Sequence, residues 1–355
     1  MRALAITLIG AALTLPLAAQ AAARKPAGTK AAGIPRTPDG KPDLEGTWTN
    51  ETITPVERPA TFTTQALSAE EAARLEKNVT DRIERLSKPS DPNRSAPPKG
   101  GDGSTGAAGN VGGYNNFWID AGEKVAVVNG ERRSSLVVDP PDGKVPAQTP
   151  EARQRQAERL RGSFGAGQYD HPELRPLGER CLLSFGSSSG PPMLPNYFYN
   201  NNYRIVQTPE HVMILVEMVH DARIVRVGPN AGTHPPKHIR PWMGDSIGHW
   251  EGDTLVVETT NFHPLQVFRG ASENLKVIER FTRADADTIL YRFTIDDPTT
   301  FTKQWSGEVP MRRTDEQIFE YACHEGNYAM SNVLSGERAQ EKLRAQSAAP
   351  APKEK

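Results

Sequence analysis

A histidine-rich segment holds most of the side chains that could move protons near neutral pH. Five of the eight histidines lie between residues 220 and 263, and His324 follows closer to the C-terminus. An imidazole changes its charge near about pH 6.5, so it can accept or donate a proton under physiological conditions. Arginines and three of the five tryptophans accompany these histidines. This composition indicates a lined pocket, although turn-forming and surface residues would give the same pattern.

His220 and Asp221 are the leading candidates for acid–base catalysis. They are adjacent in the run Glu217-Met218-Val219-His220-Asp221-Ala222-Arg223, between two apolar segments. Neighbouring residues of a strand point to opposite faces, so the two side chains meet only if a turn or a bulge intervenes. A polar hairpin tip without catalytic function would give the same pattern, and the sequence leaves both interpretations open.

His249 and His324 are further catalytic candidates. His249 precedes Trp250 in a strand–turn–strand pattern, and one of these two side chains must face inward. His324 follows Cys323, which resembles a nucleophile beside its base, although neighbours in sequence rarely form such a pair.

The residues predicted to bind a substrate combine aromatic faces with guanidinium groups. Arg240 is held between Ile239 and Pro241 beside Trp242, an arrangement suited to an anionic aromatic group. The asparagine run before Tyr203 is typical either of an elaborate loop or of a ligand-binding rim. The predicted substrate-binding residues are Tyr199, Tyr203, Arg223, Arg240, Trp242, Asp245, His263 and Arg269.

No metal site and no cofactor are predicted. His234 and His238 are four residues apart, but Pro235 and Pro236 exclude the helix on which such a pair would share a metal. Neither an HExxH nor a CxxC motif occurs. The sequence leaves open whether a divalent ion binds at the two histidines.

The elements that must position these residues are mainly strands separated by turn residues. Short helices between them are too few for a parallel βαβ sheet. We therefore predict a mainly β protein, an antiparallel meander sheet or lipocalin-like barrel with a few short helices. The predicted strands are Lys124–Val128 and Ser135–Asp139 around the hairpin turn Asn129-Gly130, then Tyr203–Gln207, Val212–Glu217, Ala222–Val227, Thr254–Thr260, Leu275–Thr282, Thr288–Thr294, Thr302–Glu308 and Gln317–Ala322. A further strand is expected from Asp245 up to the turn Glu251-Gly252-Asp253.

Three helices are expected, at Ser68–Leu86, Pro150–Arg161 and Gly336–Arg344. Ser68 and Glu71 have the spacing of a capping box, and Thr149 is a suitable cap for the second helix. The domain organisation follows from these elements. Its expected parts are a signal peptide at 1–23, a flexible lead-in at 24–41, a single β-rich domain at 42–344 with a long loop at 87–113, and a disordered tail at 345–355.

The N-terminus has the three-part pattern of a secretory signal. Arg2 supplies the positive charge and Ala3–Ala18 the apolar run, and both Ala19-Gln20-Ala21 and Ala21-Ala22-Ala23 fit a cleavage site of small residues. The apolar run is shorter than the roughly 20 residues that cross a bilayer. We therefore expect a periplasmic or secreted protein that is not inserted in a membrane after cleavage.

The two cysteines and the overall charge restrict the partners further. In an oxidising compartment Cys181 and Cys323 can form a disulfide, with two free thiols or a cysteine nucleophile as alternatives. A net charge of −1 provides no basic surface for nucleic acid. A small aromatic substrate is the expected partner, and the sequence leaves a homodimer open.

Six motifs carry a resemblance to known proteins: Leu136–Gly143, Tyr199–Tyr203, His220–Arg223, Trp242–Asp245, Trp250–Val257 and Tyr321–Tyr328. They resemble those of a widespread group of exported bacterial proteins. That group is similar to sphingomonad proteins that act without a cofactor on lignin-derived aromatic dimers of the phenylcoumaran type, as lyases or decarboxylases. The resemblance implies this activity class and assigns no role to individual residues.

Two functions are compatible with the sequence. The first is an exported, cofactor-independent lyase, a decarboxylase or formaldehyde lyase, that uses histidine and arginine side chains on aromatic dimers. The alternative is a periplasmic protein that binds a small molecule or a surface without catalysis. For the lyase we expect His220 and Arg240 to matter more to activity than Cys323.

Overall fold

The computed structural model describes residues 33–87, 93, 95, 119–164, 167–184, 190–196, 199–266 and 268–348. The expected signal peptide lies outside the described residues, as do most of the loop expected at 87–113 and the tail from residue 349 onward. The described residues belong to one compact unit that begins at Gly33. Within them, no helix combines the length and the apolar composition that crossing a membrane requires.

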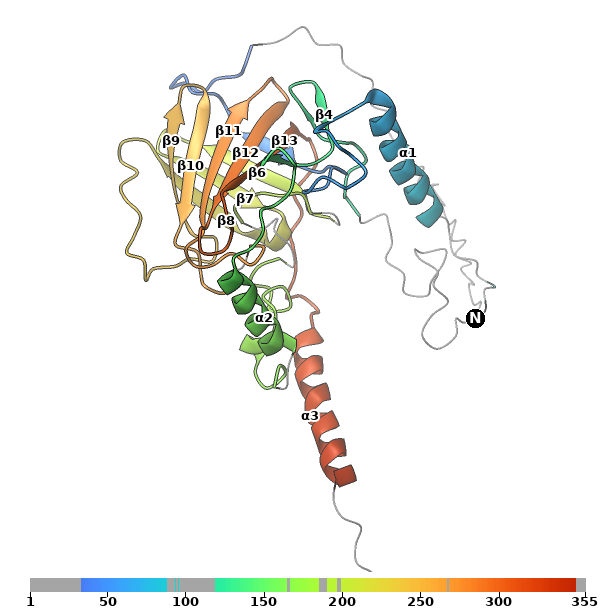
Figure 1. The fold of residues 1–355 in the computed structure, drawn as a ribbon. Helices are drawn as coiled ribbons and strands as arrows, with labels where there is room; N and C mark the ends of the chain where they lie inside the picture. Colours follow the sequence, from blue (N-terminus) through green and yellow to red (C-terminus); the bar gives the residue numbers. More distant parts are fainter. Residues whose placement is uncertain are drawn as a thin grey trace, which may run out of the picture. The chain divides into compact units, whose positions relative to one another are not determined.

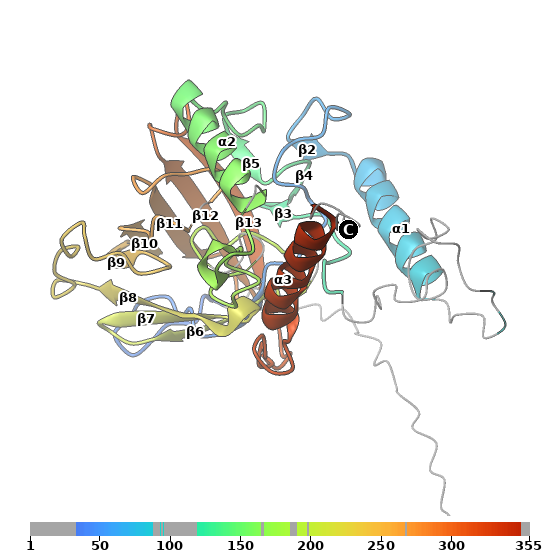
Figure 2. The same ribbon diagram turned by 90° about the horizontal axis from the view of Figure 1, so that it is seen from below.

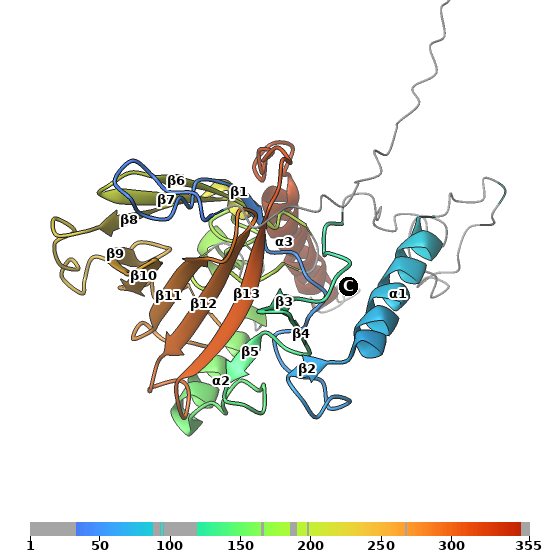
Figure 3. The ribbon, with the colours of Figure 1, turned by 90° about the horizontal axis from the view of Figure 1, so that it is seen from above.

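Nine strands close into a barrel, which confirms the predicted fold class. Figures 1 and 2 show β6–β8 on one side of the barrel and β11–β13 on the other. β13 pairs with β1 at Trp48–Arg313 and Thr49–Arg312, and this pairing closes the ring (Figure 3). Around the barrel the order is β1 (Gly46–Thr49), β6 (Asn202–Gln207), β7 (His211–Val216), β8 (Ala222–Val227), β9 (Asp245–Glu251), β10 (Thr254–Thr260), β11 (Lys276–Arg283), β12 (Thr288–Asp296) and β13 (Trp305–Arg313).

One pair of neighbouring strands departs from the antiparallel order. β8 and β9 run parallel, with Val225 opposite Ser246 and Val227 opposite Gly248. A parallel connection must carry the chain back along the barrel, and residues 228–244 do this without a helix. The prolines of this crossing loop fit an extended path that forms no strand ladder.

The two ends of the barrel differ in their connections. At the turn end, the joining segments are short: 208–210, 252–253 and 284–287. At the loop end, the joining segments are longer: 217–221, 261–275 and 297–304. The crossing loop also enters β9 at this end. Helix α2 (Pro150–Phe164) also lies at the loop end, where Thr149 N donates to Thr300 O at 2.9 Å (Figure 1).

Aromatic side chains fill the described interior of the barrel. The centroids of Phe293 and Trp305 are 5.6 Å apart in an edge-to-face arrangement, and those of Phe281 and Tyr291 are 5.1 Å apart. Gly307 is required beneath them, because a Cβ there would lie 2.5 Å from the Phe293 ring. All these side chains are fully buried. A ligand site is therefore expected at an end of the barrel.

A buried ion pair crosses this interior. Arg223 of β8 is 4% exposed and Glu279 of β11 is 0% exposed. The Arg223 guanidinium donates to both Glu279 oxygens, with Nη2 to Oε1 at 2.9 Å. The Tyr291 hydroxyl donates to Glu279 Oε1 at 3.0 Å and accepts from Met193 N at 2.9 Å. Arg223, which was predicted to bind substrate, therefore forms an ion pair with Glu279 inside the barrel.

The two predicted N-terminal helices begin where the sequence places them. In α1 (Ala69–Leu86), Ser68 and Glu71 form the capping box, with bonds of 3.1 and 2.8 Å. In α2, Thr149 Oγ1 accepts from Ala152 N at 3.1 Å. Both helix starts are confirmed.

The C-terminal helix is longer than predicted. α3 spans Ala329–Ala348, so residues 345–348 are helical and do not belong to a disordered tail. Asn327 Oδ1 accepts from Ala329 N at 3.1 Å and caps the helix well before Gly336. Alanine and glutamine, both good helix formers, then continue it past Arg344.

The Asn129-Gly130 hairpin is confirmed, but one of its strands is not the predicted one. Both turn residues have positive φ, 51° and 81°, as a tight hairpin turn requires. β3 (Val127–Val128) pairs with β4 (Glu131–Arg133), and β4 also pairs with β2 (Ala66–Leu67). The predicted partner instead forms β5 (Val137–Asp139), which adds to β13 outside the ring.

The strand predicted at Thr302–Glu308 begins later and continues through Pro310 as β13. Pro310 lies opposite Leu290 of β12. On the other edge of β13, β5 pairs before Pro310 and β1 pairs after it, so no neighbouring strand needs the N–H group that proline lacks. The strand predicted at Gln317–Ala322 does not form. β13 already has neighbours on both edges, so this segment leaves the barrel, and Phe319 is 68% exposed.

Part of the predicted flexible lead-in is ordered. Arg36 donates to both carboxylate oxygens of Asp253 at 2.9 and 2.7 Å. Thr37 N donates to Lys41 O at 2.9 Å and forms a turn. Residues 33–41 therefore pack against the turn end of the barrel.

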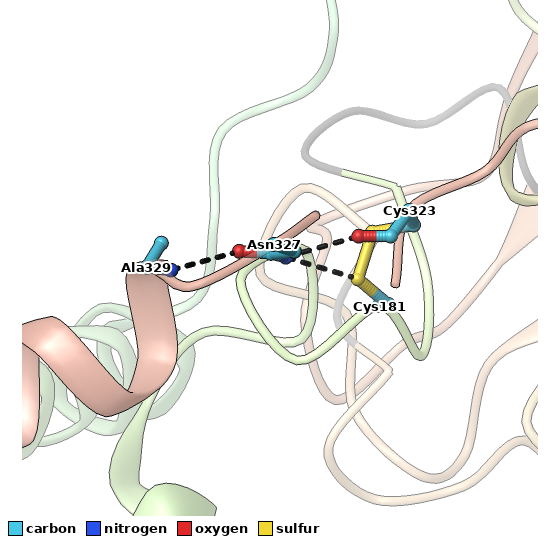
Figure 4. The surroundings of a disulfide bond; sticks show 4 residues. All are labelled: Cys181, Cys323, Asn327 and Ala329. Atoms are coloured by element: carbon cyan, nitrogen blue, oxygen red, sulfur yellow. Dashed lines mark hydrogen bonds between the residues drawn. A yellow bond between two sulfur atoms is a disulfide. The ribbon is translucent and has the colours of Figure 1, made fainter. Parts of the chain in front are cut away.

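Cys181 and Cys323 form a disulfide, as favoured from the sequence (Figure 4). Their Cα atoms are 5.7 Å apart across a sequence separation of 142 residues. Asn327 Nδ2 donates to Cys323 O at 3.0 Å, so the cap of α3 is tied to the bridge. The disulfide fastens the segment that leaves β13 to the region before β6.

Replacing both cysteines by serine is expected to lower the free energy of unfolding by about 2–4 kcal/mol, because a long loop is no longer closed in the unfolded chain. Urea unfolding of the purified protein measures the change. Wild-type protein in reducing agent should show the same shift. An unchanged unfolding midpoint in both samples would contradict a stabilising bridge.

Candidate functional site

The predicted catalytic histidines are dispersed. His249 lies near the turn end of β9, exposed, with Nε2 3.1 Å from Glu251 Oε1. His324 is exposed next to the disulfide. His220 ends a short 3₁₀ turn, Met218–His220, at the loop end, and its side chain lies outside the described part of the chain. His220 therefore has a backbone position at the loop end, whereas His249 does not.

The turn that the His220–Asp221 pair requires is present. Val219 has a positive φ of 70°, and Val216 N donates to Asp221 O at 2.8 Å. The chain therefore reverses between β7 and β8 instead of continuing as a strand. Asp221 is half-buried in this turn. A catalytic role for the pair stays a prediction.

Trp242 and His263 form the clearest aromatic site at the loop end. Their ring centroids are 3.9 Å apart and their planes differ by 32°. His263 N donates to Pro241 O at 3.1 Å, which joins the crossing loop to the segment after β10. Both side chains are half-buried, so part of the pair faces solvent.

The environment of His263 keeps its ring neutral. Burial and the positive charge of Arg180 lower the pKa of His263 below its usual value. Nδ1 accepts from Leu265 N at 3.2 Å, so the neutral ring carries its proton on Nε2. His263 can therefore offer a neutral N–H donor to a developing negative charge.

The crossing loop is fastened so that Trp242 has a fixed position. Asp245 Oδ2 lies 2.6 Å from His234 Nδ1 and accepts from Arg226 Nη2 at 2.9 Å. Arg240 Nη1 donates to Phe262 O at 3.2 Å and to Glu273 O at 3.0 Å. Asp245 and Arg240, both predicted to bind substrate, thus hold the loop on each side of Trp242.

Gly244 makes the close approach of this loop to β10 possible. Its φ is +71°, and a Cβ at this position would lie 2.6 Å from Thr260 O. Any side chain would strain the backbone and push Trp242 away from β10. This explains a glycine within the Trp242–Asp245 motif.

The two histidines of the proline-rich motif do not act as a pair. His234 contacts Asp245, with Glu258 Oε1 3.5 Å from its other ring nitrogen, whereas His238 is exposed. In the part of the chain that the structure describes, no group of three or more histidine, cysteine, aspartate or glutamate side chains is placed to hold a metal ion. Arg269 lies farther along the 261–275 loop, with Nη1 3.5 Å from Glu57 Oε1.

The asparagine run organises the loop end through its own hydrogen bonds. Asn201 is fully buried, and its side chain accepts from Asn196 N at 2.6 Å and donates to Asn196 O at 2.7 Å. The same amide donates to Asp120 O. These bonds support the loop interpretation. Tyr199 packs half-buried against the core, and Tyr203 is buried within it.

Sequence reasoning missed a group of carboxyl groups at the loop end. Burial, a hydrogen bond to Glu51 and the charge of Glu51 raise the pKa of Asp120 to about 8. Glu217 is 4% exposed, and burial raises its pKa although the backbone N–H groups of Asn202 and Phe319 donate to it. Asp120 therefore keeps a proton at neutral pH. No sequence motif marks Asp120, since its raised pKa comes from burial and from Glu51, which is distant in the sequence.

The loop end thus combines an aromatic face, a neutral imidazole and a carboxyl group that carries a proton at neutral pH. Comparisons with protein-family models, curated proteins and solved structures find no match. Glu217 follows β7 and Trp242 precedes β9, and only β8 separates these strands, about 10 Å in total.

Asp120→Asn is expected to flatten the pH dependence of stability. Between pH 3.8 and about 8, Asp120 is protonated in the folded protein and ionised in the unfolded chain. Wild-type stability therefore falls as the pH rises through this range. Denaturant midpoints at about pH 5 and about pH 8 measure the slope. Glu123→Gln, at an exposed carboxylate, should keep the wild-type slope. An unaltered slope in Asp120→Asn would contradict the protonated carboxyl group.

Proposed function

We propose that this protein is an exported, cofactor-independent lyase that cleaves a carbon–carbon bond in aromatic dimers of the phenylcoumaran type. One observation carries the proposal: the neutral His263 stacked on Trp242 and the protonated Asp120, whose backbone oxygen accepts from Asn201 just before β6, both lie at the loop end of the barrel. Paired groups whose environments push their pKa values apart are typical of acid–base sites. The disulfide and the N-terminal pattern support export.

The reaction of an alcohol substrate balances without an oxidant or a reductant. The substrate phenol loses its proton to water, the electron pair of the phenolate breaks the benzylic carbon–oxygen bond of the dihydrofuran ring, and the ether oxygen takes up a proton from Asp120. The hydroxymethyl group then loses its O–H proton, its carbon–carbon bond breaks, and formaldehyde leaves. The bonding electron pair restores the phenol, which regains a proton, and a stilbene results. For an acid substrate, carbon dioxide leaves instead.

The side chains at the loop end match the needs of these steps. Asp120 can donate its proton to the ether oxygen and then, as a carboxylate, accept the hydroxymethyl proton. The His263 Nε2–H can hold the phenol oxygen while it is negatively charged. Trp242 offers a ring face for stacking. The substrate itself accepts the electrons, so the proposal requires no cofactor.

The test uses the mature protein, purified from the periplasm of a bacterial host. A phenylcoumaran-type alcohol and the corresponding acid are incubated with it separately, and chromatography with ultraviolet detection follows the stilbene. We expect stilbene and an equal amount of formaldehyde or carbon dioxide. Unchanged substrate in both reactions would reject the lyase. Saturable binding of unchanged substrate would instead establish a binding protein.

A further inference from the structure

A groove between α2 and the 261–275 loop carries two arginines with no carboxylate partner in the described part of the chain. Its volume is about 380 Å³, in the range of sites that hold small organic molecules. Arg155 and Arg159, one helical turn apart on α2, form one wall. Ser272, Asn274 and Thr299 add polar groups to its lining.

Backbone contacts hold both guanidinium groups at the groove. Arg155 Nη2 donates to Thr299 O and to Thr300 Oγ1, each at 3.1 Å. Arg159 Nη2 donates to Pro264 O at 3.2 Å. Each guanidinium has five N–H donors, so most of them remain for another acceptor. The side chains are exposed but anchored, which lowers the entropy cost of binding a ligand.

The charges around the groove favour an anion. Like charges at this helical spacing repel each other, and partial burial together with Arg155 lowers the pKa of Arg159. Glu273 is the one carboxylate among the lining residues, and its charge is offset by Arg240, whose Nη2 lies 3.8 Å away. An oxyanion between the two arginines would relieve their repulsion.

We propose that this groove binds an oxyanion-bearing small molecule through Arg155 and Arg159. The shared chemistry is a carboxylate, phosphate or sulfate group held by two guanidinium forks. The groove lies beside the Trp242–His263 pair, since Pro264 follows His263 directly, but neither ring lines it. This binding site is independent of the lyase proposal.

The test measures binding of benzoate, inorganic phosphate and sulfate by calorimetry, each at constant ionic strength in chloride. We expect saturable binding of at least one anion, weakened about tenfold or more in Arg155→Gln/Arg159→Gln, as the loss of charge-assisted hydrogen bonds implies. Preference for benzoate identifies an organic acid as the source, and preference for phosphate or sulfate a tetrahedral anion.

The matched control is Arg153→Gln/Arg161→Gln, which removes the same charge from the same helix outside the groove. Its affinity should equal that of the wild type. Equal weakening in both double variants would show unspecific attraction and overturn the site, as would the absence of saturable binding to all three anions. Circular dichroism establishes that each variant is folded, and Arg159→Lys, which keeps the charge, provides a second variant should the Gln pair unfold.

Discussion

Glu279→Ala is expected to lower the free energy of unfolding by about 3–5 kcal/mol, because it leaves the Arg223 guanidinium without a counter-ion inside the barrel. Both residues are almost completely buried among aromatic rings. The Tyr291 hydroxyl would also lose its acceptor. Guanidinium chloride unfolding at neutral pH measures the loss directly.

The control for this prediction removes both charges together. Arg223→Met/Glu279→Leu should recover most of the lost stability, because two apolar side chains leave no unpaired charge buried in the barrel. Arg280→Ala, which breaks the exposed 2.6 Å contact with Glu251, should cost less than about 1 kcal/mol. If Glu279→Ala lowered the free energy of unfolding as little as Arg280→Ala does, the Arg223–Glu279 pair would not stabilise the barrel.

The barrel was predictable because several of its strands, β7, β8, β11 and β12, alternate between buried and more exposed residues. In β12, Ile289, Tyr291 and Phe293 are fully buried while the residues between them are half-exposed. This period of two is visible in the sequence and needs no knowledge of the partner strands. Local caps were equally visible, as the Ser68–Glu71 box shows.

Strand partners were less predictable because pairing depends on distant residues. β1 has only four residues, yet it closes the barrel between β6 and β13. Gln317–Ala322 has a strand-like composition but finds no free edge. The same reason explains why Ser135–Asp139 was assigned to the nearest hairpin, although part of it joins β13.

The candidate site was predicted in its aromatic part and missed in its acidic part. Trp242 and His263 stand out by residue type, whereas Asp120 is an ordinary aspartate in sequence. Its proton depends on burial and on Glu51, which lies 69 positions earlier in the chain. Likewise, nothing in the sequence shows that Arg223 pairs with Glu279 and is withdrawn from solvent.

His263→Ala is expected to lower the turnover of a phenylcoumaran-type substrate by about 10²–10³-fold, the usual loss for one donor to a developing oxyanion. The Nδ1 contact with Leu265 N leaves the Nε2–H as the donor, and Trp242 holds the ring in place. Initial rates of stilbene formation at saturating substrate measure the effect. His211→Gln, at an exposed histidine of β7 near the turn end, should retain the wild-type rate.

Two substitutions at the same position separate hydrogen bonding from stacking. His263→Gln keeps an N–H group near the place of Nε2 but loses the aromatic ring, whereas His263→Phe keeps a ring against Trp242 and has no donor. If the N–H stabilises a negative oxygen in the transition state, the glutamine variant should be faster than the phenylalanine variant, with the difference in kcat. A faster phenylalanine variant, with its difference in KM, would show that His263 only completes an aromatic binding face. The acid–base work would then belong to Asp120 and its neighbours, with His220 as the next histidine to replace.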